Sequence, residues 1–218
     1  MDKWNNQVIK RPHQIEEYQR QAEKLRNSTF INCWSASESM SLSMWELFGG
    51  GLESVAIKTT KSKLRKVVEN YSSDYFNGEV VRVNYLDNLI ALSHETNQEV
   101  WEIISQSNST ISASFSIKPI EYQYESEVRA IFTPTKTRSG EFETEMPTES
   151  AIKVPIHMNN KGPKNSMIEF IEEVHIHPFL DEESMFYEVV RDINYKYDIG
   201  SIPVKSRTIK ALEKDLYK

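Results

Sequence analysis

Hydrophobic and polar residues alternate along several short stretches of the chain, and this period of two is typical of β-strands that bury one face. The clearest example is 122–133, where charged residues fall on one face and small or apolar residues on the other. Strands are predicted near 29–34, 53–59, 78–86, 111–117, 122–133, 151–156 and 172–177.

Other stretches repeat their apolar residues every three to four positions, which predicts amphipathic helices. From about Ser39 onward this spacing places Leu42, Trp45 and Phe48 on one side, and Thr60 is a suitable N-cap for the basic helix that follows it. Helices are predicted near 12–27, 39–48, 61–71, 96–107, 166–172, 181–197 and 206–217.

The order of these elements predicts the fold class. Helices are interspersed among the strands, which excludes a pure β-sandwich, and the successive strands within 110–133 favour antiparallel pairing. We therefore expect an α+β fold with a mixed, mainly antiparallel central sheet surrounded by helices. No repeat or linker divides the chain, so a single domain over 1–218 is expected. Its parts would be an amino-terminal helix at about 12–27, a core over about 29–178 and carboxy-terminal helices within about 181–217.

Composition narrows the class of protein. With 218 residues, of which 39% are hydrophobic, the chain can bury a core of its own. The formal net charge of −6 does not favour a nucleic-acid or anionic membrane surface. Cys33 is the single cysteine and cannot form an internal disulfide. The single cysteine and the lack of a long apolar run or a signal-peptide core predict a cytoplasmic protein without membrane contact. The sequence leaves the oligomeric state open.

Three motifs are weak as functional sites. The 7 glycines form no phosphate-binding motif. His175 and His177 would share one face of a strand, but no third ligand has a recognisable spacing, so no metal site is expected. The basic run from Lys58 to Lys66 is typical of a solvated helix face, with phosphate or RNA contact as the alternative.

The strongest candidates for chemistry are Glu125, Glu127 and Arg129, which would share one face of a strand. One carboxylate near a ribose can stabilise an oxocarbenium-like transition state, while the other accepts a proton from the attacking group. Arg129 would temper their repulsion or bind a pyrophosphate. The alternative is an edge strand that presents its charges to water. Because apolar residues follow Glu127, we expect it to be more enclosed than Glu125 and paired with Arg129 or a serine.

The segment CWSAS, residues 33–37, is a second candidate. Cys33 and Trp34 are expected to end a buried strand, with Cys33 as a packed thiol, since no partner that would stabilise a thiolate is evident. Ser35 and Ser37 either cap the following helix or take part in a site. Trp45 is either a core residue or an aromatic ring that stacks on a base or on nicotinamide.

Three motifs together resemble a known bacterial family, domain-of-unknown-function family 2971. They are CWSASESMSLSMW at 33–45, VAIKTT at 55–60 and YESEVRAI at 124–131. The resemblance extends over about residues 30–210, and the joint spacing is more specific than any one motif. The chain differs from the family pattern at Met40–Ser41, where an acidic residue usually precedes the serine.

The order of parts is also similar to the ADP-ribosyltransferase superfamily, in which a Ser-x-Ser strand and a Glu-x-Glu segment flank the nicotinamide riboside of NAD. This similarity implies that NAD or a related nucleotide is a substrate rather than a prosthetic group. It implies transfer or hydrolysis of ADP-ribose in a bacterial toxin-like or phage-defence setting. The implied roles are Glu127 as the main carboxylate, Glu125 as the group that activates the acceptor, Ser35 and Ser37 at the ribose, and Trp45 and Arg129 lining the cleft.

Two functional interpretations follow from these residues. In the first, the chain is an enzyme of the ADP-ribosyltransferase type. In the second, it is a non-catalytic binding or protein-interaction module in which Glu125, Glu127 and Arg129 form a structural ion network. Replacing Glu127 with Gln would remove activity in the first case and stability in the second.

Overall fold

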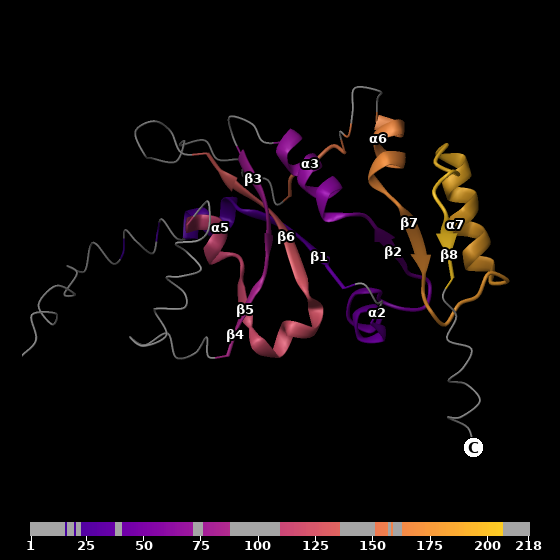
Figure 1. The fold of residues 1–218 in the computed structure, drawn as a ribbon, viewed down its shortest axis with the longest axis horizontal. Helices are drawn as coiled ribbons and strands as arrows, with labels where there is room; N and C mark the ends of the chain where they lie inside the picture. The colour runs from indigo at the N-terminus through magenta and orange to yellow at the C-terminus, as the bar shows by residue number, and fades with distance from the viewer. Residues whose placement is uncertain are drawn as a thin grey trace, which may run out of the picture.

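A computed structural model of the chain describes residues 16, 20, 23–37, 41–71, 76–87, 110–135, 151–156, 158 and 163–206. Figure 1 shows small sheets with helices packed around them. The predicted α+β fold class with mainly antiparallel pairing is confirmed. The strands are divided among three sheets, however, and do not form one central sheet.

The largest contribution to the site comes from an antiparallel sheet in which β6 is the middle strand. Its order is β1 (Phe30–Ser35), β6 (Glu127–Pro134) and β3 (Phe76–Arg82). In the register, Phe30 pairs with Phe132 and Ser35 with Glu127. Because β6 is central and buried along nearly its whole length, the edge-strand interpretation of the Glu-x-Glu segment is wrong.

The second sheet has the order β2 (Val55–Lys58), β7 (Glu173–Ile176) and β8 (Val204–Lys205). β2 runs antiparallel to β7, while β7 and β8 are parallel. The sequence pattern did not predict β8, which is only two residues long. A third, parallel pair consists of β4 (Asn84–Leu86) and β5 (Ile117–Pro119), and it lies beside the start of β6.

Helices connect and cover these sheets. In the described residues they are α2 (Leu42–Phe48), α3 (Lys61–Tyr71), α5 (Thr110–Ser114), α6 (Pro163–Phe170), α7 (Met185–Lys196) and the 3₁₀ helix η1 (Ile120–Glu125). Residues 23–28 are also helical. The helices predicted at 96–107 and 206–217 lie outside the described residues, with the exception of Ser206. Most of the helix predicted at 12–27 also lies outside them.

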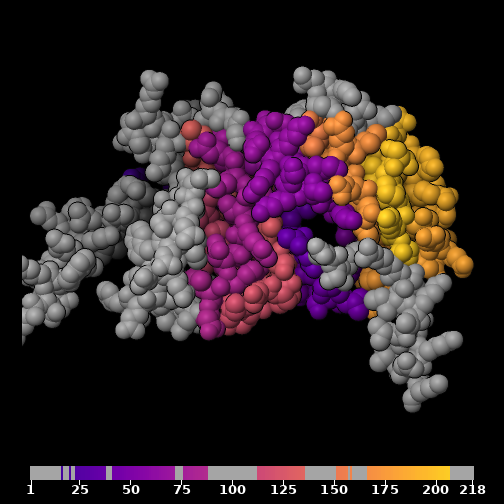
Figure 2. Space-filling view, in the orientation of Figure 1, coloured from indigo at the N-terminus to yellow at the C-terminus, as the bar shows by residue number. Residues whose placement is uncertain are grey.

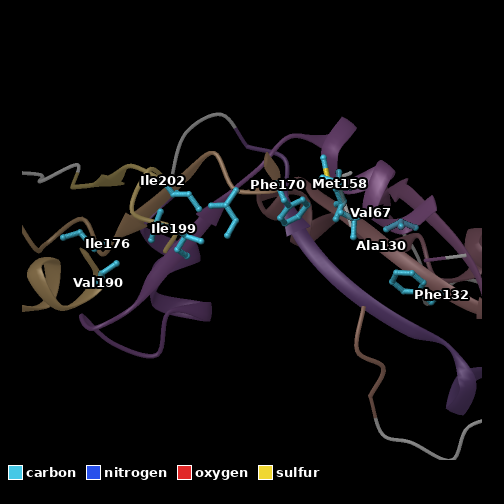
Figure 3. Packing of buried hydrophobic residues seen from close by; sticks show 14 of the residues in the cluster. Val67, Ala130, Phe132, Met158, Phe170, Ile176, Val190, Ile199 and Ile202 are labelled. Carbon is cyan, nitrogen blue, oxygen red and sulfur yellow. The ribbon is translucent and has the colours of Figure 1, made fainter. Parts of the chain in front are cut away.

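A continuous hydrophobic cluster joins the two three-stranded sheets. Phe132 and Ala130 of β6 lie at one end of this cluster with Val67 of α3, and Ile176 of β7 lies at the other with Val190 of α7 (Figure 3). On the side of β3, α3 approaches so closely that a Cβ on Gly78 would lie 2.7 Å from Val68 Cγ1. The cluster explains how the sheets are held together, while a single domain over 1–218 stays a prediction because it includes residues outside the described ranges.

The strand predicted near 78–86 is divided between β3 and β4, which belong to different sheets. Three other predicted strands differ from the structure. The segment 111–117 is not a strand: it contains most of α5, followed by a turn and the start of β5. Its alternation arises from serines that satisfy helix-end carbonyls, as when Ser116 Oγ donates to the Ala113 carbonyl at 2.9 Å. The segment 151–156 belongs to no strand, although Ile152, Val154 and Ile156 do pack on the core cluster as their alternation predicts.

The third difference lies in 122–133, where the predicted strand begins only at Glu127. Residues 120–125 form η1, which ends at Ser126 in the left-handed region with a φ of 46°. The Ser126 N–H donates to the Gln123 carbonyl at 3.1 Å, which closes this turn. A non-glycine residue with positive φ is uncommon, and a pattern of alternating charges contains no signal for it.

Candidate functional site

The start of β6 is the point where the predicted site residues meet. Ser35 lies opposite Glu127 in the β1–β6 register, and its hydroxyl donates to the Glu125 carbonyl at 3.0 Å. On the other side of β6, the Val83 N–H donates to the Glu127 carbonyl at 2.9 Å. Strands on both sides therefore fix the backbone of Glu127, and the αL turn at Ser126 brings Glu125 back toward it.

Four charged side chains, Lys118, Glu125, Glu127 and Arg129, form what we call the charge cluster. Lys118 Nζ lies 2.5 Å from Glu125 Oε2 and 3.4 Å from Glu127 Oε2. Glu125 and Glu127 are both buried, with 6% and 4% of their surface exposed. Glu127 is thus the more enclosed of the two, as predicted, but only slightly, because η1 folds Glu125 inward as well.

Arg129 is the principal partner of Glu127, as the sequence analysis predicted. Its Nε donates to Glu127 Oε1 at 2.9 Å and its Nη2 donates to Oε2 at 3.0 Å, which is a bidentate pair. Arg129 Nη1 donates to the Phe115 carbonyl at 2.5 Å. The guanidinium thus links β6 to the turn between α5 and β5, so the cluster is also a cross-link between segments distant in sequence.

These contacts decide the charge states of the cluster. Burial of Glu127 disfavours its charged form, but hydrogen bonds from Arg129 and the charges of Arg129 and Lys118 hold the pKa of Glu127 below its ordinary value of 4.5. Although burial acts in the opposite direction, pairing with the glutamates raises the pKa of Lys118 and of Arg129. At neutral pH, Glu127 is therefore a carboxylate that faces two cations.

Ser37 lies near the charge cluster, whereas Trp45 packs beside the second sheet. The Ser37 N–H donates to Ser35 Oγ at 3.4 Å, so the two serines are linked at the end of β1, and both residues are exposed. Trp45 is buried, and its ring packs edge-on against His177 with 5.3 Å between centroids. His177 follows β7 of the second sheet, so the described contact of Trp45 supports the core interpretation. The structure joins Ser35, Glu125, Glu127 and Arg129 directly.

Cys33 differs from its predicted environment. It is exposed, and the prediction of a packed thiol at the end of a buried strand is wrong, because β1 is an edge strand of its sheet. Desolvation of the thiol and its hydrogen bond to Glu127 raise the pKa of Cys33 to about 11. The thiol is therefore held in its neutral form at physiological pH.

Sequence reasoning missed several residues at the site. Lys118 precedes Glu125 by seven positions, and only the reversal of the chain through η1 brings the two side chains together. The Tyr85 hydroxyl accepts a hydrogen bond from the Glu127 N–H at 2.8 Å. Tyr122 and Tyr124 of η1 are exposed, and the Tyr122 ring lies 4.6 Å from Lys118 Nζ. Pro119 signals a turn in the sequence, but nothing there identifies these partners.

A second ion cluster accounts for part of the basic run. Hydrogen bonds from Lys205, Lys58 and His175 outweigh the opposing effect of burial and lower the pKa of Glu173 to about 2. Lys63 pairs with Glu172 at 3.0 Å. Within the described ranges, no group of three or more His, Cys, Asp or Glu side chains could hold a metal ion. His175 contacts Glu173 and His177 contacts Trp45, so each histidine has a partner other than a metal.

The surface near the site is hollowed. Figure 2 shows an opening between the indigo segment of β1 and α2 and the purple segment of β2 and α3. Ser35 is the last residue of β1, and the chain continues from it to α2. Among the described helices, none is both long and apolar enough to cross a membrane.

The fold and the site define an α+β protein with two buried carboxylates and two partly buried cations clustered at the start of β6. A family model described as "Protein of unknown function (DUF2971)" matches residues 44–130, and over this range the chain is similar to that family. The match includes most of α2, all of β3 and the Glu125–Glu127 segment. No curated protein and no solved structure matches the chain.

Proposed function

We propose that the charge cluster binds NAD or a related nucleotide and that its glutamates assist the transfer or hydrolysis of ADP-ribose. The observation that supports this proposal most is the direct pairing of Ser35 with Glu127, together with the hydrogen bond from Ser35 to Glu125. Convergence of the serine segment with both glutamates is what the similarity to ADP-ribosyltransferases requires. The setting in bacterial defence or a toxin-like system carries over from that similarity alone.

The chemistry of the cluster is compatible with the reaction. The bond between the ribose anomeric carbon and the nicotinamide nitrogen breaks, and nicotinamide leaves with the bonding electron pair. An ionised Glu127 stabilises the positive charge that develops on the ribose. The oxygen of water or of an acceptor hydroxyl then bonds to the anomeric carbon, and its proton passes to Glu125. The exposed ring of Tyr122, which lies 4.6 Å from Lys118 Nζ, offers a stacking surface beside the charge cluster.

A second candidate function is a non-catalytic binding or interaction module. Both carboxylate oxygens of Glu127 already accept hydrogen bonds from Arg129, and Arg129 also holds the Phe115 carbonyl. Such saturation by the protein's own groups is expected of a structural network. However, buried ion clusters are weak contributors to stability compared with well-packed apolar residues, which favours a functional reason for their presence.

The first test is incubation of the protein with NAD and measurement of released nicotinamide, with a parallel thermal-shift assay. We expect nicotinamide release above the buffer rate and a raised melting temperature at saturating NAD, because a ligand that binds only the folded state stabilises it. ATP and free nicotinamide serve as ligand controls. The absence of both nicotinamide release and a shift in melting temperature would contradict the proposal and favour the interaction module.

A further inference from the structure

Lys118 is the one cation that joins the two glutamates of the cluster. Its ammonium contacts Oε2 of Glu125 at 2.5 Å and Oε2 of Glu127 at 3.4 Å. Arg129 by contrast pairs with Glu127. Among the described residues, Lys118 is the only cation paired with Glu125. The charge balance of Glu125 therefore depends on a side chain that also touches Glu127.

The position of Lys118 is fixed by the small parallel sheet. Lys118 is the middle residue of β5 and lies opposite Tyr85 of β4 in the register. Tyr85 in turn binds the first N–H of β6 through its hydroxyl, and the Asn84 N–H donates to the Ser116 carbonyl at 2.7 Å. The Tyr122 ring covers the ammonium at 4.6 Å. Two strands and one aromatic ring thus hold Lys118 between the carboxylates.

The geometry of the two carboxylates makes this ammonium important. Because both Oε2 atoms lie within 3.4 Å of the same nitrogen, they are at most about 6 Å apart, a range over which like charges disfavour double ionisation. Both glutamates are also buried. Without the ammonium, such a pair tends to share a proton and to titrate as a coupled unit. The described titratable and charged groups around the pair are Lys118, Arg129, Cys33, Tyr85 and Tyr122.

We propose that Lys118 is a positioning residue whose ammonium balances the charges of the Glu125–Glu127 pair and holds the two carboxylates side by side. In this role Lys118 sets the pH below which the site stops working. The effect of Lys118 on catalysis rests on the proposed function, in which Glu125 must be free of a proton in order to accept one. The effect of Lys118 on the charges of the two carboxylates does not depend on that function.

The test compares Lys118→Met, which removes the charge, with Lys118→Arg, which keeps it. Carboxyl carbon NMR follows the titration of the pair in the full chain, and Glu125→Gln and Glu127→Gln spectra assign the two signals. We expect one carboxyl of the pair in Lys118→Met to titrate at least about one pH unit higher than in the wild type, with Lys118→Arg close to the wild type. Unchanged titration in Lys118→Met would overturn the proposal.

Two further readouts separate the possible failures. If Lys118→Met does not fold, the wild-type spectrum decides: both carboxyls ionised at pH 6 support the proposal, and one still protonated at pH 6 overturns it. If the wild type releases nicotinamide from NAD, the acid limb of its pH–rate profile should move to higher pH in Lys118→Met but not in Lys118→Arg. A wild type without nicotinamide release contradicts the proposed function, while the NMR titration still decides the role of Lys118.

Discussion

Replacing Arg129 with Met is expected to lower the free energy of unfolding by about 3–5 kcal/mol. The variant would leave Glu127 buried with Lys118 at 3.4 Å as its remaining described cation. It would also remove the donor to the Phe115 carbonyl. Loss of a bidentate partner lowers the free energy of unfolding far more for a buried carboxylate than for an exposed one, because water cannot replace the lost hydrogen bonds. Urea denaturation at pH 7 measures this loss.

The matched control is Arg191→Met, which removes an arginine of the exposed pair with Glu188 and should cost less than about 1 kcal/mol. The pH dependence gives a second check. The pKa of Glu127 is lowered in the folded state, so its stabilising effect is present above pH 4.5 and is lost as pH falls through its folded-state pKa. The deficit of Arg129→Met should therefore shrink on acidification below pH 4.5. Equal costs for both arginines would contradict the account of the cluster.

Replacing Ile131 with Ala is expected to cost about 2–5 kcal/mol, because it would leave a cavity beside the central strand. Ile131 is completely buried, with 0% of its surface exposed, and it lies on the same face of β6 as Glu127 and Arg129. Such burial requires that this face is covered within the protein. Urea denaturation of the variant therefore tests whether β6 is internal.

Ile31→Ala is the matched control, since Ile31 lies opposite Ile131 in the β1–β6 register and is 39% exposed. Because much of its side chain already contacts water, its removal should cost about 1 kcal/mol or less. Similar costs at the two positions would mean that the charged face of β6 is not enclosed, and the environment assigned to Glu127 would then be wrong.

The central strand shows what the sequence could predict. Alternation in 127–132 correctly separates Glu127 and Arg129 from Val128 and Ala130, because side-chain direction in a strand follows directly from position. The sequence also predicted the partner of Glu127, since two residues on one face at that spacing are neighbours. Burial of the whole strand was not predictable from alternation, as it depends on what the other segments place above each face.

The contacts of Glu125 lay beyond sequence reasoning for a different reason. Its burial depends on η1 and on the positive φ of Ser126, and both arise from the closing of a turn rather than from a periodic pattern. The same turn brings Lys118 Nζ to 2.5 Å from Glu125 Oε2. Cys33 was predicted as packed because the sequence shows no partner that would stabilise a thiolate, but an edge strand exposes it. In each case, the burial and contacts of the residue depend on the tertiary structure and not on the local sequence.

Nicotinamide release from NAD by Glu127→Gln, compared with the wild type, tests the central claim most directly. The control is Glu121→Gln, which changes an exposed glutamate of η1 close to the same site. Rates are expressed per folded molecule, with the folded fraction measured by circular dichroism, so that a loss of stability is not counted as a loss of activity. The account predicts a rate at least about 100-fold below the wild type for Glu127→Gln and no such loss for Glu121→Gln. Equal rates for the wild type and Glu127→Gln would contradict it.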